Sequence, residues 1–301
     1  MNKKPLVSVI MPVYNGSIFM AKAIESILHQ TYAHIEFLIV DDGSTDDTAK
    51  ILKRYKKASP KKIRLFRMKK NSGAFAATNF AFSHAKGTYI ALMDSDDISH
   101  RRRIEKEVAF LEIHPDVILV GTNARIIDGK GRIIGKKHYP SDHENLYKIF
   151  AWVNPIVHPS AMIRRSLLPT VPYLYHTNFG VNSDYYTFFE WLNLGKFANL
   201  PDDLFSYRIH GTNSSLQNLK EKFYTITKIR LEAVTKLHYR APAWLFPAMA
   251  VQMLVVLLLP EAVLRELFFY VRGIKEPRLR LPGFFINLKH TTIKRYALSA
   301  R

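Results

Sequence analysis

Short apolar runs alternate with helical stretches along the first 120 residues of the chain. The runs at 6–14, 35–40, 63–68 and 89–94 are rich in Val, Ile and Leu, which favour buried strands. Between them, apolar residues recur at the spacing of amphipathic helices. A fifth strand over 117–128 leads into a Gly-containing hairpin. This order predicts an α/β fold with a mostly parallel sheet and helices on both of its faces.

Polar side chains follow each of these strands at the point where the strand ends. In parallel sheets, ligands bind outside the carboxyl ends of the strands. The polar clusters are therefore expected to meet at one site of nucleotide size. They are Pro12 to Asn15, Asp41-Asp42, Asn71, and Asp94 with Asp96.

The last part of the chain is both basic and apolar. From Lys220 to Arg301 there are 15 Lys and Arg against 5 Asp and Glu, so a net charge of +10 out of +19 lies in the last quarter. Residues 241–259 carry no charge and as a helix would be roughly 28 Å long. Pro242, Pro247 and the basic flanks favour an in-plane or re-entrant membrane helix over a span, although a span stays open.

The composition narrows the class of protein further. The excess of positive charge suits an anionic membrane surface or a phosphorylated substrate. No nucleic-acid-binding motif is present, so no specific nucleic-acid partner is expected. The chain has no Cys, which excludes disulfides and thiolate chemistry.

Three carboxylates follow the strand at 89–94, in the stretch "MDSDDISHRRR". Asp96, together with Asp94, is the expected ligand set for Mn²⁺ or Mg²⁺, which prefer oxygen ligands. The alternative is an ordinary loop, with Asp97 as the N-cap of the following helix. For the arginines at 101–103, a solvated helix face is the default interpretation.

Several motifs together resemble glycosyltransferase family 2, the inverting enzymes of the GT-A fold that use nucleotide sugars. They occur between residues 5 and 216 in the order and spacing of that family. The motifs are "VSVIMPVYNG", "EFLIVDDGSTDDT", "NSGAFAATNFAFSHAKGTYIALMDSDD" and "SDYYTFFEWLNLG" followed by "YRIHGTNSS".

The resemblance assigns roles to individual residues. Asp184 would be the general base, Asp42 would reach the nucleotide base, and Asp94 would touch the ribose or the diphosphate. Asp96 would ligate the metal. The remaining donor contacts would be Pro12, Tyr14, Asn15, Arg208, His210 and Ser214.

Three positions call for separate comment. The Glu that usually precedes the base is Ser183 here, and a Pro common after the acidic cluster is Arg101. Both departures from the family pattern concern the step in which the sugar is transferred to the acceptor. His158, in "NPIVHPS", is a candidate acceptor contact, with a structural hydrogen bond as the alternative.

These observations predict a GT-A domain at 1–219, with a nucleotide-sugar half at 1–120 and an acceptor half at 121–219. A helical, membrane-associating region would follow at 220–301. The expected activity is sugar transfer to a hydroxyl of a glycan or lipid-linked acceptor, in the building of cell-surface polysaccharide at the cytoplasmic membrane face. The alternatives are transfer to polyprenyl phosphate and a non-catalytic nucleotide-sugar binder.

Overall fold

The computed structural model describes residues 4–211, 213 and 217–271 of the 301-residue chain. The predicted Ser214 contact and the chain beyond residue 271 lie outside the described residues. Within them, one sheet of nine strands forms the centre of the molecule.

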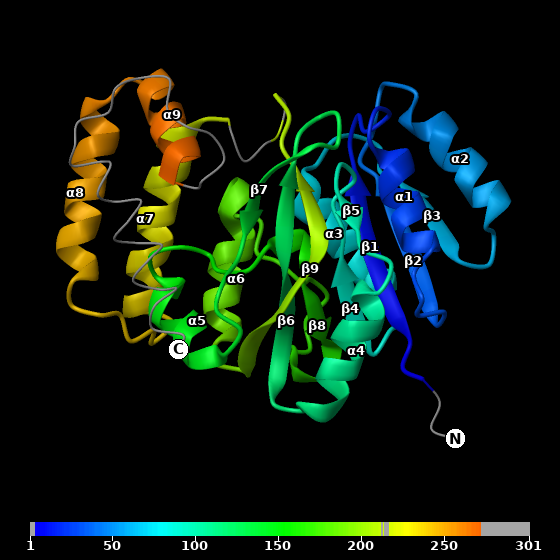
Figure 1. Ribbon diagram of the computed structural model, residues 1–301, viewed down its shortest axis with the longest axis horizontal. Coiled ribbons are helices and arrows are strands. Elements are labelled where there is room, and N and C mark those ends of the chain that lie inside the picture. The colour runs from blue at the N-terminus through cyan, green and yellow to red at the C-terminus, as the bar shows by residue number, and fades with distance from the viewer. Residues whose placement is uncertain (1–3, 212, 214–216, 272–301) are drawn as a thin grey trace.

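The first four strands pair in parallel in the order β3-β2-β1-β4. Their apolar side chains are buried on both faces, because helices cover both sides of the sheet (Figure 1). The four strands and the α/β class predicted from the sequence are confirmed. The strands are β1 (Val7–Val13), β2 (Ile35–Asp41), β3 (Ile63–Arg67) and β4 (Tyr89–Leu92), and the helices between them are α1 (Met20–Leu28), α2 (Thr48–Ala58) and α3 (Ala74–His84).

The second half of the sheet is mixed rather than parallel. The short β8 (Met162–Arg164) runs antiparallel to β4 and to β6 (Val117–Ile127), because it enters from a loop and not from a crossover helix. β9 (Lys196–Arg208) pairs in parallel with β6 and antiparallel with β5 (Ile98–Ser99). β7 (Ile133–Lys137) completes the predicted hairpin with β6.

The remaining helices surround this second half. They are α4 (Arg103–Ile113), α5 (His143–Phe150), α6 (Ser183–Trp191), α7 (Leu219–Thr235), α8 (Leu245–Leu258) and α9 (Glu261–Val271), with short 3-10 helices η1 (His158–Ser160), η2 (Arg165–Leu167) and η3 (Gly180–Asn182).

The last three helices, α7 to α9, form a layer beside α5 and α6 (Figure 1). Ile229 and Ala233 of α7 and Met249 of α8 belong to the same hydrophobic cluster as Phe150 and Phe189. Among the described residues, no helix has both the length and the apolar character needed to cross a membrane. Of the apolar stretch at 241–259, α8 includes the 14 residues Leu245–Leu258.

Arg103 departs from the solvated helix face expected for the arginines. Its side chain is fully buried and pairs with Glu107 at 3.1 Å, while its Nη2 donates to the carbonyl of Leu92 at 2.8 Å. The pair lies directly behind the end of β4, where it fixes the helix that follows the acidic cluster.

The Arg103–Glu107 pair can be tested through protein stability. Burial raises the pKa of Glu107 to about 7, against the opposing effect of Arg103, so both groups are charged at pH 8. Glu107→Ala leaves a buried cation without its counter-ion, which should lower the free energy of unfolding by about 3–5 kcal/mol. Urea denaturation at pH 8 measures this loss.

The matched control is Glu105→Ala, which breaks an exposed pair with Arg102 on the same helix. Its effect on the free energy of unfolding should be much smaller. Equal losses of unfolding free energy in the two variants would show that the buried pair contributes no more stability than the exposed pair.

Candidate active site

A cavity of about 1770 Å³ opens at the carboxyl ends of β1, β2 and β4. The loops after these strands line one end of it, and α7, α8 and α9 line the other. Of the predicted polar clusters, Pro12 to Asn15, Asp42, Asn71, and Asp94 with Asp96 all face this space. These residues therefore meet at one cavity, as expected. Asp41 does not line it, and its Oδ1 instead accepts a hydrogen bond from the backbone N–H of Ser44 at 2.9 Å.

The loops after β1 and β2 are joined to each other at the nucleotide end of the cavity. Asn15 has φ +48°, a left-handed conformation that Asn tolerates better than most residues. Its side-chain oxygen accepts a hydrogen bond from the backbone of Thr45 at 2.9 Å, and its own backbone donates to Ser44 Oγ at 3.0 Å. Tyr14 beside it is 46% exposed, so its ring is accessible for stacking.

Asp42 shapes the loop that follows β3. Its two carboxylate oxygens accept hydrogen bonds from the backbone N–H groups of Ser72 and Gly73 at 2.9 and 2.8 Å. Burial raises the pKa of Asp42 above its ordinary value, and the two hydrogen bonds partly oppose this. Asp42 thus both lines the cavity and holds the segment that leads into α3.

The acidic cluster forms a tight turn after β4. Asp94, Asp96 and Asp97 each place a carboxylate oxygen within 4.8 Å of the others. Burial raises the pKa of Asp94 to about 7, with further contributions from Asp96 and Asp184. Burial, together with Asp96 and Asp94, also raises the pKa of Asp97 well above its ordinary value. The fold therefore holds these three carboxyl groups together after β4, although their negative charges repel one another.

Asp97 is not the helix cap that the sequence suggested. β5 follows it directly, and α4 begins only at Arg103. Asp97 Oδ1 instead accepts a hydrogen bond from the backbone N–H of Arg208 at 2.7 Å, across 111 residues of sequence. The cap interpretation failed because two residues of strand come between the cluster and the helix.

The end of β9 holds the acidic turn in place. His210 Nε2 lies 2.8 Å from Asp96 Oδ2, and Asn213 Nδ2 donates to the same oxygen at 3.3 Å. Arg208 Nε donates to the backbone carbonyl of Asp96 at 2.6 Å and Nη1 to that of Asp128 at 2.9 Å. The segment with the predicted donor contacts Arg208 and His210 thus contacts the metal-binding candidate Asp96 directly.

Arg208 occupies a different place from the one expected. It is 2% exposed, does not line the cavity, and lies under the ring of Phe19 with 4.8 Å between its guanidinium carbon and the ring centroid. In this conformation it positions the acidic turn rather than facing the cavity, so its contact with a diphosphate stays a prediction.

The acidic turn fits a hard divalent cation. Its oxygen ligands are those that Mg²⁺ and Mn²⁺ prefer. Asp97 Oδ2 is buried and, among the described residues, has no hydrogen-bond partner. A buried acceptor without a partner is costly, and a cation would satisfy it. Asp94 and Asp96 are the two members of the cluster that line the cavity.

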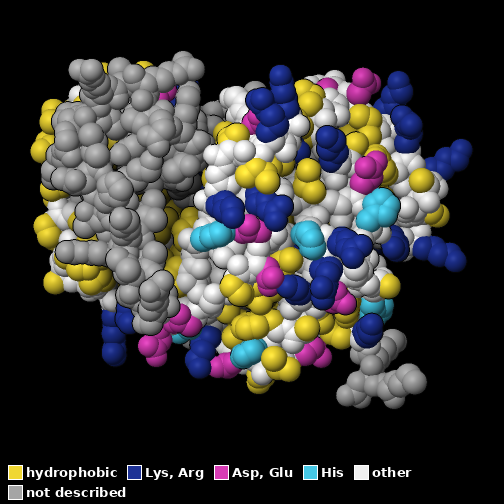
Figure 2. Space-filling view, in the orientation of Figure 1, with side chains coloured by type: hydrophobic (Ala, Val, Ile, Leu, Met, Phe, Trp, Pro, Cys, Tyr) yellow, Lys and Arg dark blue, Asp and Glu magenta, His cyan; other side chains and the backbone are white. Residues whose placement is uncertain are grey.

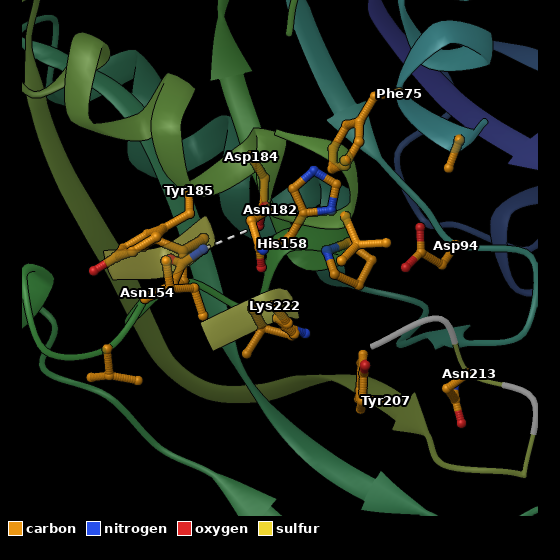
Figure 3. A pocket seen from close by; sticks show the side chains of 18 of the residues that line it. Phe75, Asp94, Asn154, His158, Asn182, Asp184, Tyr185, Tyr207, Asn213 and Lys222 are labelled. Atoms are coloured by element: carbon orange, nitrogen blue, oxygen red, sulfur yellow. Dashed lines mark hydrogen bonds between the residues drawn. The ribbon is translucent and has the colours of Figure 1, made fainter. Parts of the chain in front are cut away.

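Asp184 lies on the other side of the cavity from Asp94 (Figure 3). It stands in the first turn of α6, and its Oδ2 accepts a hydrogen bond from Asn154 Nδ2 at 3.1 Å. Ser183 is fully buried and its hydroxyl donates to the carbonyl of Gly180, so it offers nothing to the cavity. Asn154 is therefore the neighbour that orients the candidate base.

His158 lies between Asp94 and Asp184 in Figure 3. Its Nε2 is 3.0 Å from the hydroxyl of Tyr175, and burial lowers its pKa while Asp184 raises it. His158 lines the cavity and also makes the structural hydrogen bond that was the alternative. The structural hydrogen bond is therefore confirmed, and the contact with an acceptor stays a prediction.

A family model described as Glycosyl transferase family 2 matches residues 8–181. The chain belongs to glycosyl transferase family 2. The resemblance read from its motifs is thereby confirmed.

Two relatives show how far the similarity of this family 2 chain extends. It is 42% identical over 171 residues to the putative glycosyltransferase EpsE of Bacillus subtilis, covering 57% of this chain and 60% of that one. It is 30% identical over 240 residues to the O-antigen biosynthesis glycosyltransferase WbnJ of Escherichia coli, covering 77% and 89%.

Solved structures of low sequence identity confirm the GT-A fold. S. aureus TarS in complex with UDP superposes with a TM-score of 0.62 at 19% identity, covering 83% of this chain and 70% of that one. The mannosyltransferase PcManGT from Pyrobaculum calidifontis, in complex with GDP-Man and Mn²⁺, gives 0.58 at 21% identity, covering 99% and 86%.

Three residues of this family 2 site were missed by the sequence analysis. Asn154 begins the quoted "NPIVHPS" stretch, where the Asn-Pro pair was a usable signal. Asn213 lies in "YRIHGTNSS", and only its partner Asp96 reveals its place. Lys137 lines the cavity and lowers the pKa of Asp94 and Asp97, but a Lys at the end of a hairpin carries no signal in the sequence.

The metal assignment can be tested by direct binding of Mn²⁺. Asp96→Asn removes one charged ligand and should weaken Mn²⁺ binding at least about tenfold, since even the loss of an outer-shell partner typically costs about 10–100-fold. Isothermal titration calorimetry measures the affinity. Asp202→Asn, in an exposed pair with Lys106, is the control and should bind as the unmodified protein does. Unchanged affinity in Asp96→Asn would exclude this residue as a ligand.

Proposed function

We propose that the protein is a metal-dependent, inverting glycosyltransferase. It transfers a sugar from a nucleoside-diphosphate sugar to a hydroxyl of a glycan or lipid-linked acceptor, in the building of cell-surface polysaccharide. The proposal rests on one observation, which is that carboxylates face a single cavity from two sides. Asp94 and Asp96 face it from the end of β4, and Asp184 faces it from α6.

The reaction divides between these two sides of the cavity. Asp184 takes the proton of the acceptor hydroxyl, whose oxygen then bonds to the anomeric carbon. The bond from that carbon to the phosphate oxygen breaks, and its electron pair leaves with the nucleoside diphosphate. Attack from the face opposite the leaving group inverts the configuration. A divalent cation at Asp96, when bound, offsets the negative charge of the diphosphate.

Other residues bind and orient the donor and the acceptor. Tyr14 has the exposed ring needed to stack on a nucleotide base, and Pro12 and Asn15 shape the loop around it. Asn154 holds Asp184 through one carboxylate oxygen and leaves the other for the proton. His158 is placed to contact the acceptor between the two acidic groups.

Relatives support the polysaccharide assignment. WbnJ is named for O-antigen biosynthesis and TuaG of Bacillus subtilis for putative teichuronic acid biosynthesis. The solved complexes with UDP-GlcNAc and GDP-Man support a nucleotide-sugar donor, and that with Mn²⁺ supports a metal. The second candidate is transfer to polyprenyl phosphate, which is favoured by the buried cation Arg230 beside the cavity.

Association with the cytoplasmic face of a membrane is part of the proposal. The outer face of α8 carries exposed apolar side chains, and hydrophobic atoms gather along the α8 edge in Figure 2. A helix with such a face on a basic chain suits the surface of an anionic membrane. The exposed residues are Phe246, Leu254, Leu257 and Leu258, at 47%, 55%, 56% and 71%.

The role of Asp184 can be tested by release of nucleoside diphosphate from a panel of UDP-, GDP- and dTDP-sugars with Mn²⁺ and membrane lipid extract. Asp184→Asn keeps the shape of the side chain but cannot take a proton, so turnover should fall by about 10²–10⁴-fold. Binding of the nucleoside diphosphate should not change, because Asp184 lies on the acceptor side.

Near-normal turnover in Asp184→Asn would contradict the hydroxyl acceptor and favour transfer to a phosphate, which needs no base. Binding of nucleoside diphosphate without turnover of any donor would favour the non-catalytic binder.

Membrane association can be tested with vesicles of phosphatidylglycerol and phosphatidylcholine. The double variant Leu254→Asp, Leu258→Asp should lower the bound fraction strongly, since each buried Leu contributes about 1.5–3 kcal/mol. Co-sedimentation at low salt measures binding. Ile113→Asp, at an equally exposed site on α4, is the control. A protein that stays in solution with anionic vesicles would contradict the proposal.

A further inference from the structure

The cavity continues past the acidic residues into an apolar arm. One side of this arm is α8, which presents the stripe Ala248, Val251, Gln252, Val255 and Val256. Its residues recur at the three-to-four-residue spacing of one helix face. Leu264 and Leu267 of α9 line the same arm. The predicted donor contacts Tyr14, Asp42 and Asp96 lie at the other end, so this arm is not needed to hold a nucleotide sugar.

The other side of the arm is a stripe of α7 that carries two cations. Lys222, Ile226 and Arg230 are four residues apart, so they lie on one face of the helix, and all three line the cavity. An apolar channel thus runs beside two positive charges. Figure 3 shows Lys222, Asn154 and Tyr207 among the residues that line this pocket.

Arg230 is buried without a counter-ion. It is 4% exposed, and its guanidinium donates to Gln252 Oε1 and the carbonyl of Trp152, both at 2.7 Å. It also interacts with the hydroxyl of Tyr185, so all three of these partners are neutral. Its Nε is buried and, within the described part of the chain, has no hydrogen-bond partner, nor does any carboxylate there lie within 4 Å of it. A buried charge is normally paired, so this arrangement calls for an anion.

The anion site is connected to the candidate base by a short path. Trp152, whose carbonyl accepts from Arg230, lies two residues before Asn154, which donates to Asp184. The guanidinium is also stacked on the ring of Trp152, with 5.5 Å from its carbon to the ring centroid. A phosphate held by Arg230 would therefore lie on the acceptor side of the cavity.

We propose that this arm binds a single-chain lipid phosphate or diphosphate, with its phosphate on Arg230 and its chain along α8 and α9. The inference rests on the proposed function, because this lipid would be the acceptor or carry the acceptor sugar. The chain beyond residue 271 is a poor alternative counter-ion, since residues 272–301 contain eight Lys and Arg but one acidic residue, Glu276.

The test uses the full chain with farnesyl diphosphate as the probe, in EDTA so that the metal site does not bind it. Farnesol supplies the chain alone, and inorganic diphosphate supplies the charge alone. We expect farnesyl diphosphate to bind at least tenfold more tightly than either of them, as measured by isothermal titration calorimetry below the micelle concentration.

Two variants test the phosphate contact at Arg230 and the apolar arm separately. Arg230→Gln should weaken farnesyl diphosphate binding at least tenfold and leave farnesol binding unchanged. Val255→Trp, which fills the arm, should weaken both. Lys228→Gln, an exposed cation of the same helix, is the matched control and should change neither.

The inference is overturned if farnesol binds as tightly as farnesyl diphosphate, if inorganic diphosphate does so, or if Arg230→Gln binds as the unmodified protein does. The comparison of the three probes needs no variant, so it tests lipid phosphate binding even if Arg230→Gln does not fold. Binding of UDP with Mn²⁺ should be the same in Arg230→Gln. Lipid binding in a protein that turns over no donor would contradict the proposed function alone.

Discussion

The repulsion among Asp94, Asp96 and Asp97 is the constraint on which the rest of the site depends. Three carboxylates with oxygens within 4.8 Å of one another are stable only where the fold compensates for their charge. The chain does so with the end of β9, whose backbone and side chains at Arg208, His210 and Asn213 hold the turn. The remaining compensation is what a divalent cation would supply.

This dependence links distant parts of the chain. The acidic turn follows β4, and its partners lie more than 110 residues later, so the donor site is complete only when β9 pairs with β5 and β6. Arg103 and Glu107 support the same turn from behind. On the acceptor side, Asn154 and Asp184 come from a loop and a helix that the second half of the sheet positions. The second half of the fold therefore contributes to both sides of the proposed site.

The sequence predicted what depends on local pattern. Strands β1 to β4 were visible as apolar runs, and the rule that ligands bind at the carboxyl ends of parallel strands was enough to bring Tyr14, Asp42 and Asp96 together. The sequence did not predict the surroundings of individual charged side chains. Arg103, Arg208 and Arg230 look like any surface arginine in a chain of net charge +19, yet all three are buried. Their burial follows from tertiary packing, which has no local signal. The antiparallel β8 was missed because it is only three residues long.

The central claim is that one cavity holds a metal-bound nucleoside diphosphate on Asp96 and an acceptor beside Asp184. The most direct measurement is a crystal structure with Mn²⁺ and UDP or GDP, with the metal located by its anomalous scattering. The account predicts manganese between Asp96 and the diphosphate, with the base of the nucleotide against Tyr14. Manganese elsewhere, or a nucleotide bound away from the acidic turn, would contradict it.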